Sequence, residues 1–253
     1  MKKYVILLTT ILLASCATRK QVVYFQDSED VDLLPLSSVN QHPKIQPNDI
    51  LNIKVSALNP ESVVEFNRED QRTGNQVQRV EILRLTGYSV DEEGYILFPK
   101  VGRVFAQGLT VFELEEKLKK HLVTEVVNPN IKVMIINFKF TVHGEVRLPG
   151  TYEILDDNIT LPQALGYAGD LTINGRRNNI TIFRTEDDKR IVKHIDLTTT
   201  DWMNSPFYFI KQNDYIYVEP NNPKVSAAGY VGNVGTLLSV VSILLTTSVL
   251  IFR

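Results

Sequence analysis

The sequence has very little cysteine: Cys16 is the only one among 253 residues, so no disulfide can form within the chain. It also lacks an excess of charge, since 27 lysines and arginines stand against 29 aspartates and glutamates. A net charge of −2 gives no electrostatic reason to expect nucleic acid as a partner. A disulfide-stabilised fold is thereby excluded, and a nucleic-acid-binding function is not supported.

Signatures of catalysis and of metal binding are also missing. The sequence has four histidines, His42, His121, His143 and His194. They lack the spacing of a metal site, and the chain contains no nucleophile motif and no phosphate-binding loop. The acidic pairs Asp156-Asp157 and Asp187-Asp188 lie in turn-like segments, where solvated carboxylates are expected. We therefore predict no catalytic residue, no metal and no cofactor; an enzyme such as a glycan hydrolase is the alternative from another class.

The first sixteen residues have the layout of a bacterial lipoprotein signal. Lys2 and Lys3 precede an apolar run, Tyr4 to Leu13, which is shorter than the roughly 20 residues of a membrane span. Leu13-Ala14-Ser15-Cys16 resembles a lipobox, where a signal peptidase cleaves and the cysteine thiol accepts a diacylglycerol. An ordinary signal peptide with a chance cysteine is the alternative. We predict a signal peptide over residues 1–15 and lipid attachment at Cys16.

The predicted lipid also indicates a location. Two or three acyl chains on one cysteine anchor a protein stably, where a single chain would not. Ala17 follows the cysteine, and by resemblance to the sorting rule of enteric bacteria this favours the outer membrane over the inner one. Residues 16–43 are predicted to be a lipidated, extended linker between the membrane and the folded part of the chain.

The other end of the chain is apolar as well. Val234 to Phe252 carries no charge, and nineteen residues of helix rise about 28 Å, close to the hydrocarbon thickness of a bilayer. A buried core helix is the alternative, but such a helix would usually show a polar face and caps, and this segment has neither charge nor proline. We predict a C-terminal outer-membrane helix over residues 229–253 that crosses once and leaves Arg253 at the cell surface.

Small residues recur every three or four positions in this segment, so they share one helix face. They are Gly232, Gly235, Ser239, Ser242 and Thr246. This face either packs helix against helix, where small side chains allow close approach, or lines a water-filled pore made of many copies. Both interpretations require neighbouring copies and therefore predict an oligomer.

Residues 44–137 have the pattern of a small α+β domain. A turn at Asn48-Asp49 leads into a strand that ends near Val55, and asparagine tolerates the left-handed backbone of such a turn. Asn59 to Thr86 is polar and is expected to be an exposed loop or hairpin insertion. Val90 to Pro99 is expected to be a hairpin that turns at Glu93-Gly94.

A helix follows in the same domain. Thr110 and Glu113 have the spacing of a capping box, and Val111 to Leu122 carries apolar residues on one face. On its solvent side we expect ion pairs between residues four apart. These pairs are Glu113–Lys117, Glu115–Lys119 and Glu116–Lys120. A strand over Ile131 to Asn137 closes the domain.

Residues 138–225 repeat this plan in a second small unit. Phe138 to Glu153 is expected to form two strands, with Pro149-Gly150 placed for a type II turn between them. Thr160 and Gln163 form a second capping box, and Gly169 ends the helix that follows. Ile180 to Arg184 and Arg190 to Ile195 are expected to pair. The closing strand follows Asn213-Asp214, which repeats the turn at Asn48-Asp49.

These residues resemble a known family. Gln46 to Asp49, Asp91 to Pro99 and Thr110 to Leu122 are similar to the polysaccharide export domain. A second set of motifs resembles a soluble-ligand-binding β-grasp repeat: Val142 to Val146, Pro149-Gly150 with Tyr152, and Thr160 to Leu165 with Ala168-Gly169. Together with the lipobox and the C-terminal helix, these motifs resemble the outer-membrane polysaccharide export proteins. Asn48 and Asn213 stand where that family usually has glycine, a tolerable exchange because asparagine also visits the left-handed region.

The resemblance implies an α+β fold: a polysaccharide export domain, one β-grasp domain, and a C-terminal transmembrane helix that forms an α-helical barrel in the oligomer. It implies a homo-oligomeric ring in the outer membrane that passes capsule polysaccharide or exopolysaccharide. The polymer and an inner-membrane polysaccharide co-polymerase, or chain-length regulator, would be its partners. The alternative is a monomeric glycan-binding periplasmic lipoprotein.

Overall fold

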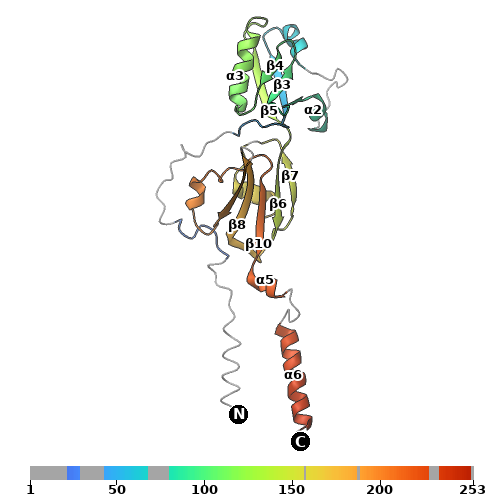
Figure 1. Ribbon diagram of the computed structural model, residues 1–253, viewed down its shortest axis with the longest axis vertical. Helices are drawn as coiled ribbons and strands as arrows, with labels where there is room; N and C mark the ends of the chain where they lie inside the picture. The colour runs from blue at the N-terminus through green and yellow to red at the C-terminus, as the bar shows by residue number, and fades with distance from the viewer. Residues whose placement is uncertain are drawn as a thin grey trace.

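The computed structural model describes residues 22–28, 43–67, 80–156, 158–186, 189–227 and 234–251. Figure 1 shows two domains, each with strands and helices, stacked along the long axis of the molecule. The C-terminal helices lie beyond the second domain, at the end away from the first. The mixed α/β architecture predicted from the sequence is therefore confirmed.

The first domain is built on a three-stranded antiparallel sheet with the order β2-β1-β5, beside a separate hairpin of β3 and β4. The strands are β1 (Ile50–Ser56), β2 (Tyr88–Ser89), β3 (Tyr95–Phe98), β4 (Gly102–Phe105) and β5 (Asn130–Ile135). Helix α3 (Val111–Leu122) packs against β5. Leu51, Ile53 and Val55 of β1 point into the core that this packing encloses, as their alternation predicts.

Helix α3 begins at the capping box that the sequence predicts. The Thr110 hydroxyl accepts a hydrogen bond from the Glu113 N–H, and the Glu113 carboxylate accepts one from the Thr110 N–H at 2.7 Å. Its apolar face, which includes Leu114 and Leu118, is buried. The first residue, the length and the buried apolar face of α3 therefore all agree with the prediction.

None of the three ion pairs predicted along α3 is present in this fully described helix, so that prediction is wrong. Glu116 lies 3.8 Å from Lys119, three residues on, and Glu113 completes the capping box. Tertiary partners take the other two groups. The Glu115 carboxylate accepts the backbone N–H of Val133 on β5 at 2.8 Å. The Lys117 ammonium donates to the carbonyl oxygen of Phe105 on β4 at 2.9 Å. An exposed pair along a helix stabilises by only about 0.3–0.5 kcal/mol, so such contacts readily replace it.

The polar segment Asn59 to Thr86 is not simply an exposed loop. It contains a 3-10 helix, η3 (Pro60–Phe66), and helix α2 (Val80–Thr86). Phe66 is fully buried, and its carbonyl oxygen accepts a hydrogen bond from the hydroxyl of Tyr88. The insertion thus adds to the core of the first domain; residues 68–79 lie outside the described part.

The hairpin of this region forms one turn later than predicted. Gly94 does make a turn, with a φ of +84° and its N–H donating to Asp91 O. The strand before it, β2, pairs with β1 through Leu51 and Tyr88. Strand β3 pairs with β4 instead, so the hairpin turns between Phe98 and Gly102.

The second domain is a five-stranded sheet with the order β7-β6-β10-β8-β9. Its strands are β6 (Phe138–Gly144), β7 (Gly150–Ile154), β8 (Gly175–Glu186), β9 (Lys189–Ile195) and β10 (Tyr215–Pro220). Strand β10 is central, parallel to β6 and antiparallel to β8. Helix α4 (Leu161–Tyr167) starts at the predicted Thr160 capping box and buries its apolar face in the core. The predicted pairing of β8 with β9 is confirmed.

The type II turn predicted at Pro149-Gly150 is wrong. That turn needs a positive φ at its glycine, but Gly150 has none and begins β7, paired with Val142. The left-handed residue of this connection is Gly144, with a φ of +94°. A Cβ on Gly144 would stand 2.0 Å from the carbonyl oxygen of Val218, so the approach of β10 determines which glycine is required.

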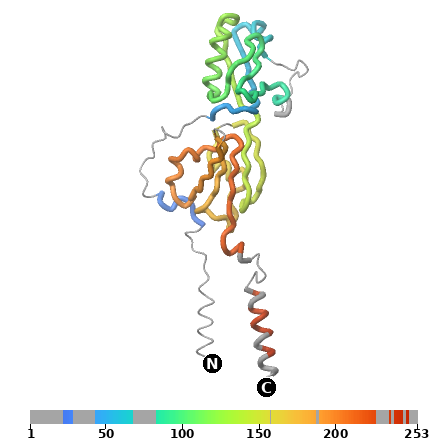
Figure 2. Tube along the Cα trace, viewed as in Figure 1, coloured from blue at the N-terminus to red at the C-terminus, as the bar shows by residue number. Residues whose placement is uncertain are grey.

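Residues 22–28 lie against the second domain, although the sequence places them in an extended linker (Figure 2, blue). The N–H groups of Phe25 and Gln26 donate to the carbonyl oxygens of Leu197 and Thr198. The Tyr24 hydroxyl donates to the Asp170 carboxylate at 2.7 Å. For these residues the linker interpretation is wrong: hydrogen bonds and aromatic packing fix them to the domain.

The chain ends in helix α5 (Asn222–Ala227) and helix α6 (Val234–Ile251). A helix thus forms where the C-terminal apolar run predicts one. Among the residues that the structure describes, no helix meets the length and apolarity of a membrane crossing. The membrane crossing therefore stays a prediction.

Candidate functional site

The two repeated turn motifs have the same geometry. In the first, the Asp49 carboxylate accepts the N–H of Gln46 at 2.8 Å, and Asn48 has a φ of +69°. In the second, the Asp214 carboxylate accepts the N–H of Lys211 at 2.9 Å, and Asn213 has a φ of +64°. Each aspartate closes a four-residue turn that an asparagine in the left-handed region makes possible.

These turns meet at the junction between the domains. Asn137 lies between β5 and β6. Its side-chain amide accepts a hydrogen bond from the Ile50 N–H and donates one to the carbonyl oxygen of Asn48 at 3.0 Å. Gln212 of the second turn accepts the N–H of Lys139 and donates to Asn137 O. The repeated motifs therefore hold the two domains together, a role that the sequence repeat did not reveal.

The two aspartates differ in electrostatic surroundings. Burial raises the pKa of the Asp49 carboxyl to about 6, and the Gln46 N–H and the Gln212 amide counter only part of that rise. Burial also raises the pKa of Asp214, but the guanidinium of Arg184 opposes it from 2.6 Å away. Asp214 is thus one half of a buried ion pair.

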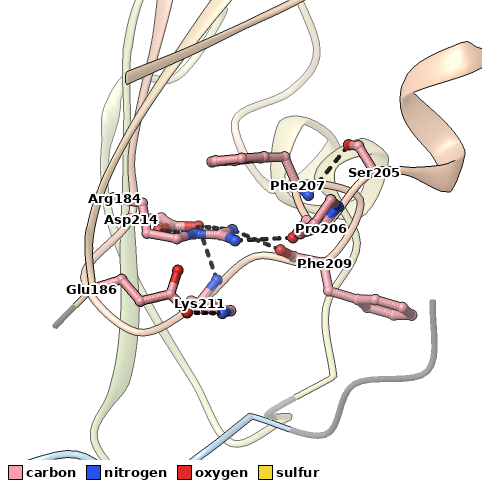
Figure 3. Close-up of polar contacts among 8 residues, drawn as sticks. All are labelled: Arg184, Glu186, Ser205, Pro206, Phe207, Phe209, Lys211 and Asp214. Carbon is pink, nitrogen blue, oxygen red and sulfur yellow. Dashed lines mark hydrogen bonds and ion pairs between the residues drawn. The ribbon is translucent and has the colours of Figure 1, made fainter. Parts of the chain in front are cut away.

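Arg184 is the centre of the polar cluster in Figure 3. Its guanidinium contacts both carboxylate oxygens of Asp214 and donates to the carbonyl oxygens of Pro206 and Phe209. It also lies 4.5 Å from the ring centroid of Phe207. All three guanidinium nitrogens donate to acceptors of the protein and the side chain is buried, so its role is to fix the 205–214 loop to β8.

Sequence reasoning missed Arg184, although a signal was present. It follows Ile180 and Ile182 at spacings of two, which places it on the inward face of its strand. An inward-facing arginine needs a buried anion, and the buried aspartate of the second turn supplies it.

The small-residue face of α6 lies on an exposed helix. Ser239 and Thr246 donate to the carbonyl oxygens of Gly235 and Ser242, one turn earlier, both at 2.8 Å. Their hydroxyls are thus satisfied within the helix and do not demand a polar partner. This leaves both interpretations of the face open; Gly232 and Cys16, the residue predicted to carry the lipid, lie outside the described residues.

Groups suited to catalysis do not converge in the described ranges. No three histidine, cysteine, aspartate or glutamate side chains gather there as a metal site. His143 lies 6.3 Å from the ring of Tyr215, and His194 shares hydrogen bonds with Thr181 and Asn179. His42, Asp157 and the pair Asp187-Asp188 lie outside the described part.

Comparison with known proteins identifies the architecture. Residues 37–136 match the family described as polysaccharide biosynthesis/export protein, and residues 139–193 match the SLBB domain. The EPS I polysaccharide export outer membrane protein EpsA of Ralstonia solanacearum is 28% identical over 156 residues, which are 60% of this chain and 41% of the relative. EpsA of Ralstonia nicotianae (strain ATCC BAA-1114 / GMI1000) is 29% identical over 163 residues, 62% of this chain and 42% of the relative. The matches thus span about two fifths of these relatives' length. The chain thus carries a domain of the polysaccharide biosynthesis/export protein family followed by an SLBB domain, in the order that the motifs predict.

Proposed function

We propose that this protein is the outer-membrane component of a polysaccharide export machine, where copies assemble into a ring-shaped channel for the polymer. The observation that carries the proposal is the export domain followed by an SLBB domain in one chain. The relatives that share this region are named polysaccharide export outer membrane proteins. The role is passive: the chain supplies a conduit, and partners in the inner membrane, such as a co-polymerase, drive the polymer.

Exposed apolar surface on α6 supports the oligomer. Leu238, Val240 and Ile243 are 50%, 51% and 65% exposed, and the small residues Ser239 and Ser242 lie among them. A helix this apolar needs cover from lipid or from other helices. A barrel of α6 helices, one from each copy, supplies both kinds of cover: lipid outside and neighbouring helices at the sides.

In this arrangement both domains lie in the periplasm. The acyl chains on Cys16 insert in the inner leaflet of the outer membrane, and α6 crosses the same membrane with Arg253 outside. An epitope tag after Arg253 tests this topology on intact cells. Antibody labelling of intact cells is expected; labelling only after outer-membrane permeabilisation would rule out the outward crossing and the pore.

The mass of the intact complex in mild detergent tests the ring. We expect one closed oligomer with a single subunit number, and accumulation of polymer inside cells from which the gene is deleted. A monomer in detergent, together with normal polymer export from the deletion strain, would instead favour the monomeric glycan-binding lipoprotein.

A further inference from the structure

A shallow hollow lies on the outer face of the second domain's sheet, the face opposite α4. Its volume is about 330 Å³, the size of a small-ligand site. It is lined by Phe183, Thr185, Arg190, Asn213 and Tyr215. These residues come from β8, β9, β10 and the turn before β10, so the strands of the sheet bring together parts of the chain up to 32 positions apart.

Aromatic rings form the floor of the hollow. Tyr215 and Phe183 are paired across β10 and β8, with ring centroids 5.7 Å apart in an edge-to-face arrangement. The His143 ring lies 6.3 Å from Tyr215 on the other side and extends the platform onto β6. Tyr215 is 37% exposed, so part of its ring is open to a ligand. A sugar ring presents a face of C–H groups, which packs on such an aromatic surface.

An arginine stands beside this floor. Arg190 pairs with Thr185 across β9 and β8, which puts both on the outer face with Phe183. In the described part of the chain Arg190 has no ion-pair partner, whereas nearby Lys211 is neutralised by Glu186 at 2.7 Å. A guanidinium binds a carboxylate through two parallel hydrogen bonds and carries its charge at all physiological pH values.

Polar groups that fit sugar hydroxyls complete the lining. The positive φ of Asn213 and the bond from its N–H to the carbonyl oxygen of Lys139 fix its backbone at the rim. Its side-chain amide can donate and accept, as can the hydroxyl of Thr185. An apolar floor, one cation and two bifunctional polar groups match the chemistry of a single acidic sugar ring.

We propose that this hollow binds one acidic sugar unit, of the hexuronic acid class, in the transported polymer. Tyr215 and Phe183 contact the face of the ring, and Arg190 binds its carboxylate. This inference rests on the proposed function, because the ligand is a unit of the exported polysaccharide. A neutral sugar would leave the charge of Arg190 unused, so the site selects acidic units over neutral ones.

Binding to the full-length lipidated protein in mild detergent tests the site, with tetragalacturonic acid as the probe and its methyl ester as the uncharged comparison. We expect wild type to bind the acid at least about tenfold more tightly than the ester. Arg190→Gln is expected to remove this preference, and Tyr215→Leu to weaken binding of both probes. Lys193→Gln is the control, because Lys193 is a cation on the same strand but on the opposite face.

Thermal midpoints must show that each variant stays folded. Equal affinity for acid and ester in wild type, or an unchanged preference in Arg190→Gln, would overturn the acidic-sugar site. Polymer export by the same strains separates this result from the proposed function. If gene deletion stops export while Arg190→Gln keeps the acid preference, only the site is wrong. If the deletion strain exports normally, the proposed function is wrong whatever the probes do.

Discussion

Asp49 and Asp214 occupy the same position in the same kind of turn, but among the described residues only Asp214 has a cation beside its carboxylate. Arg184 contacts Asp214 at 2.6 Å, while the buried Asp49 carboxylate is contacted by a backbone N–H from Gln46 and the side-chain amide of Gln212. The repeat thus gives one aspartate a compensated charge and leaves the other uncompensated, and the two should respond differently to pH and to mutation.

Asp49 should make the stability of the protein depend on pH. Its folded-state pKa, about 6, lies above its ordinary value of 3.8. A carboxyl with a raised pKa contributes stability that is fully present below about pH 4 and is lost as the pH rises through about 6. The difference corresponds to about 2–3 kcal/mol. Asp49→Asn should therefore flatten the change of melting temperature between pH 4 and pH 6.

Asparagine keeps an acceptor for the Gln46 N–H, so the variant is expected to fold. Other carboxyls titrate in the same window, and for this reason the difference between wild type and variant is the quantity to measure. If the melting temperatures of wild type and variant changed in parallel over this pH range, Asp49 would not titrate as described.

Removal of Arg184 should be costly. Arg184→Met leaves Asp214 as a buried charge without its partner, and such a loss costs about 3–5 kcal/mol. Arg176→Met is the matched control, because Arg176 lies on the same strand as Arg184. This variant breaks a half-exposed ion pair with Glu219 on β10 and should lower the stability by at most about 1 kcal/mol. The denaturation midpoints of the two variants measure the difference in stability. Replacing Asp214 by leucine as well should restore part of the loss, whereas similar losses in both arginine variants would contradict a special role for Arg184.

The two glycines of the β6–β7 connection should tolerate alanine very differently. Gly144→Ala forces a side chain onto a positive φ and into the Val218 carbonyl, and should cost about 2 kcal/mol or more. Gly150 has ordinary backbone angles and open space around its Cβ position, so Gly150→Ala should change stability by about 0.5 kcal/mol or less. The melting temperatures of both variants test this difference. A larger loss at Gly150 would restore the Pro149-Gly150 turn as the critical element.

Cys16→Ser should block lipid attachment and move the protein out of the outer-membrane fraction. Mass spectrometry of the mature N-terminus measures the lipid, and cell fractionation measures the location. Some protein is expected to remain with the membrane if α6 inserts by itself. Full outer-membrane recovery of an unlipidated Cys16→Ser protein would mean that the anchor is not needed.

Bulk added to the small-residue face of α6 should disturb the ring. Gly235→Leu and Ser242→Leu each add a large side chain where neighbouring helices or a pore are inferred, and both should reduce the detergent-stable oligomer. Leu244→Ile, outside the small-residue face, keeps the side-chain volume and should leave the oligomer intact. Equal oligomer yields from all three variants would remove the assigned face.

What the sequence predicted well is local. The capping boxes at Thr110 and Thr160 lie within four residues of the helices they start, so α3 and α4 follow from short motifs. Arg184 was missed because its partner Asp214 is 30 residues away. Gly144 was missed for the same reason, since its conformation depends on Val218 across the sheet. The burial of Phe66 likewise depends on packing that no local pattern reports.

Under the proposed function, the attachment of residues 22–28 to the second domain limits how the protein can tilt on the outer membrane. Only residues 17–21 separate that segment from Cys16, and fully extended they reach roughly 20 Å. Under the proposed function, with lipid on Cys16 and α6 in the bilayer, the second domain is tethered to the membrane at two separate points. Two attachment points restrict rotation of the domain relative to the membrane, whereas the domain could rotate freely about a single attachment point. The first domain, at the opposite end of the long axis, would then project away from the outer membrane, towards the side from which polymer arrives.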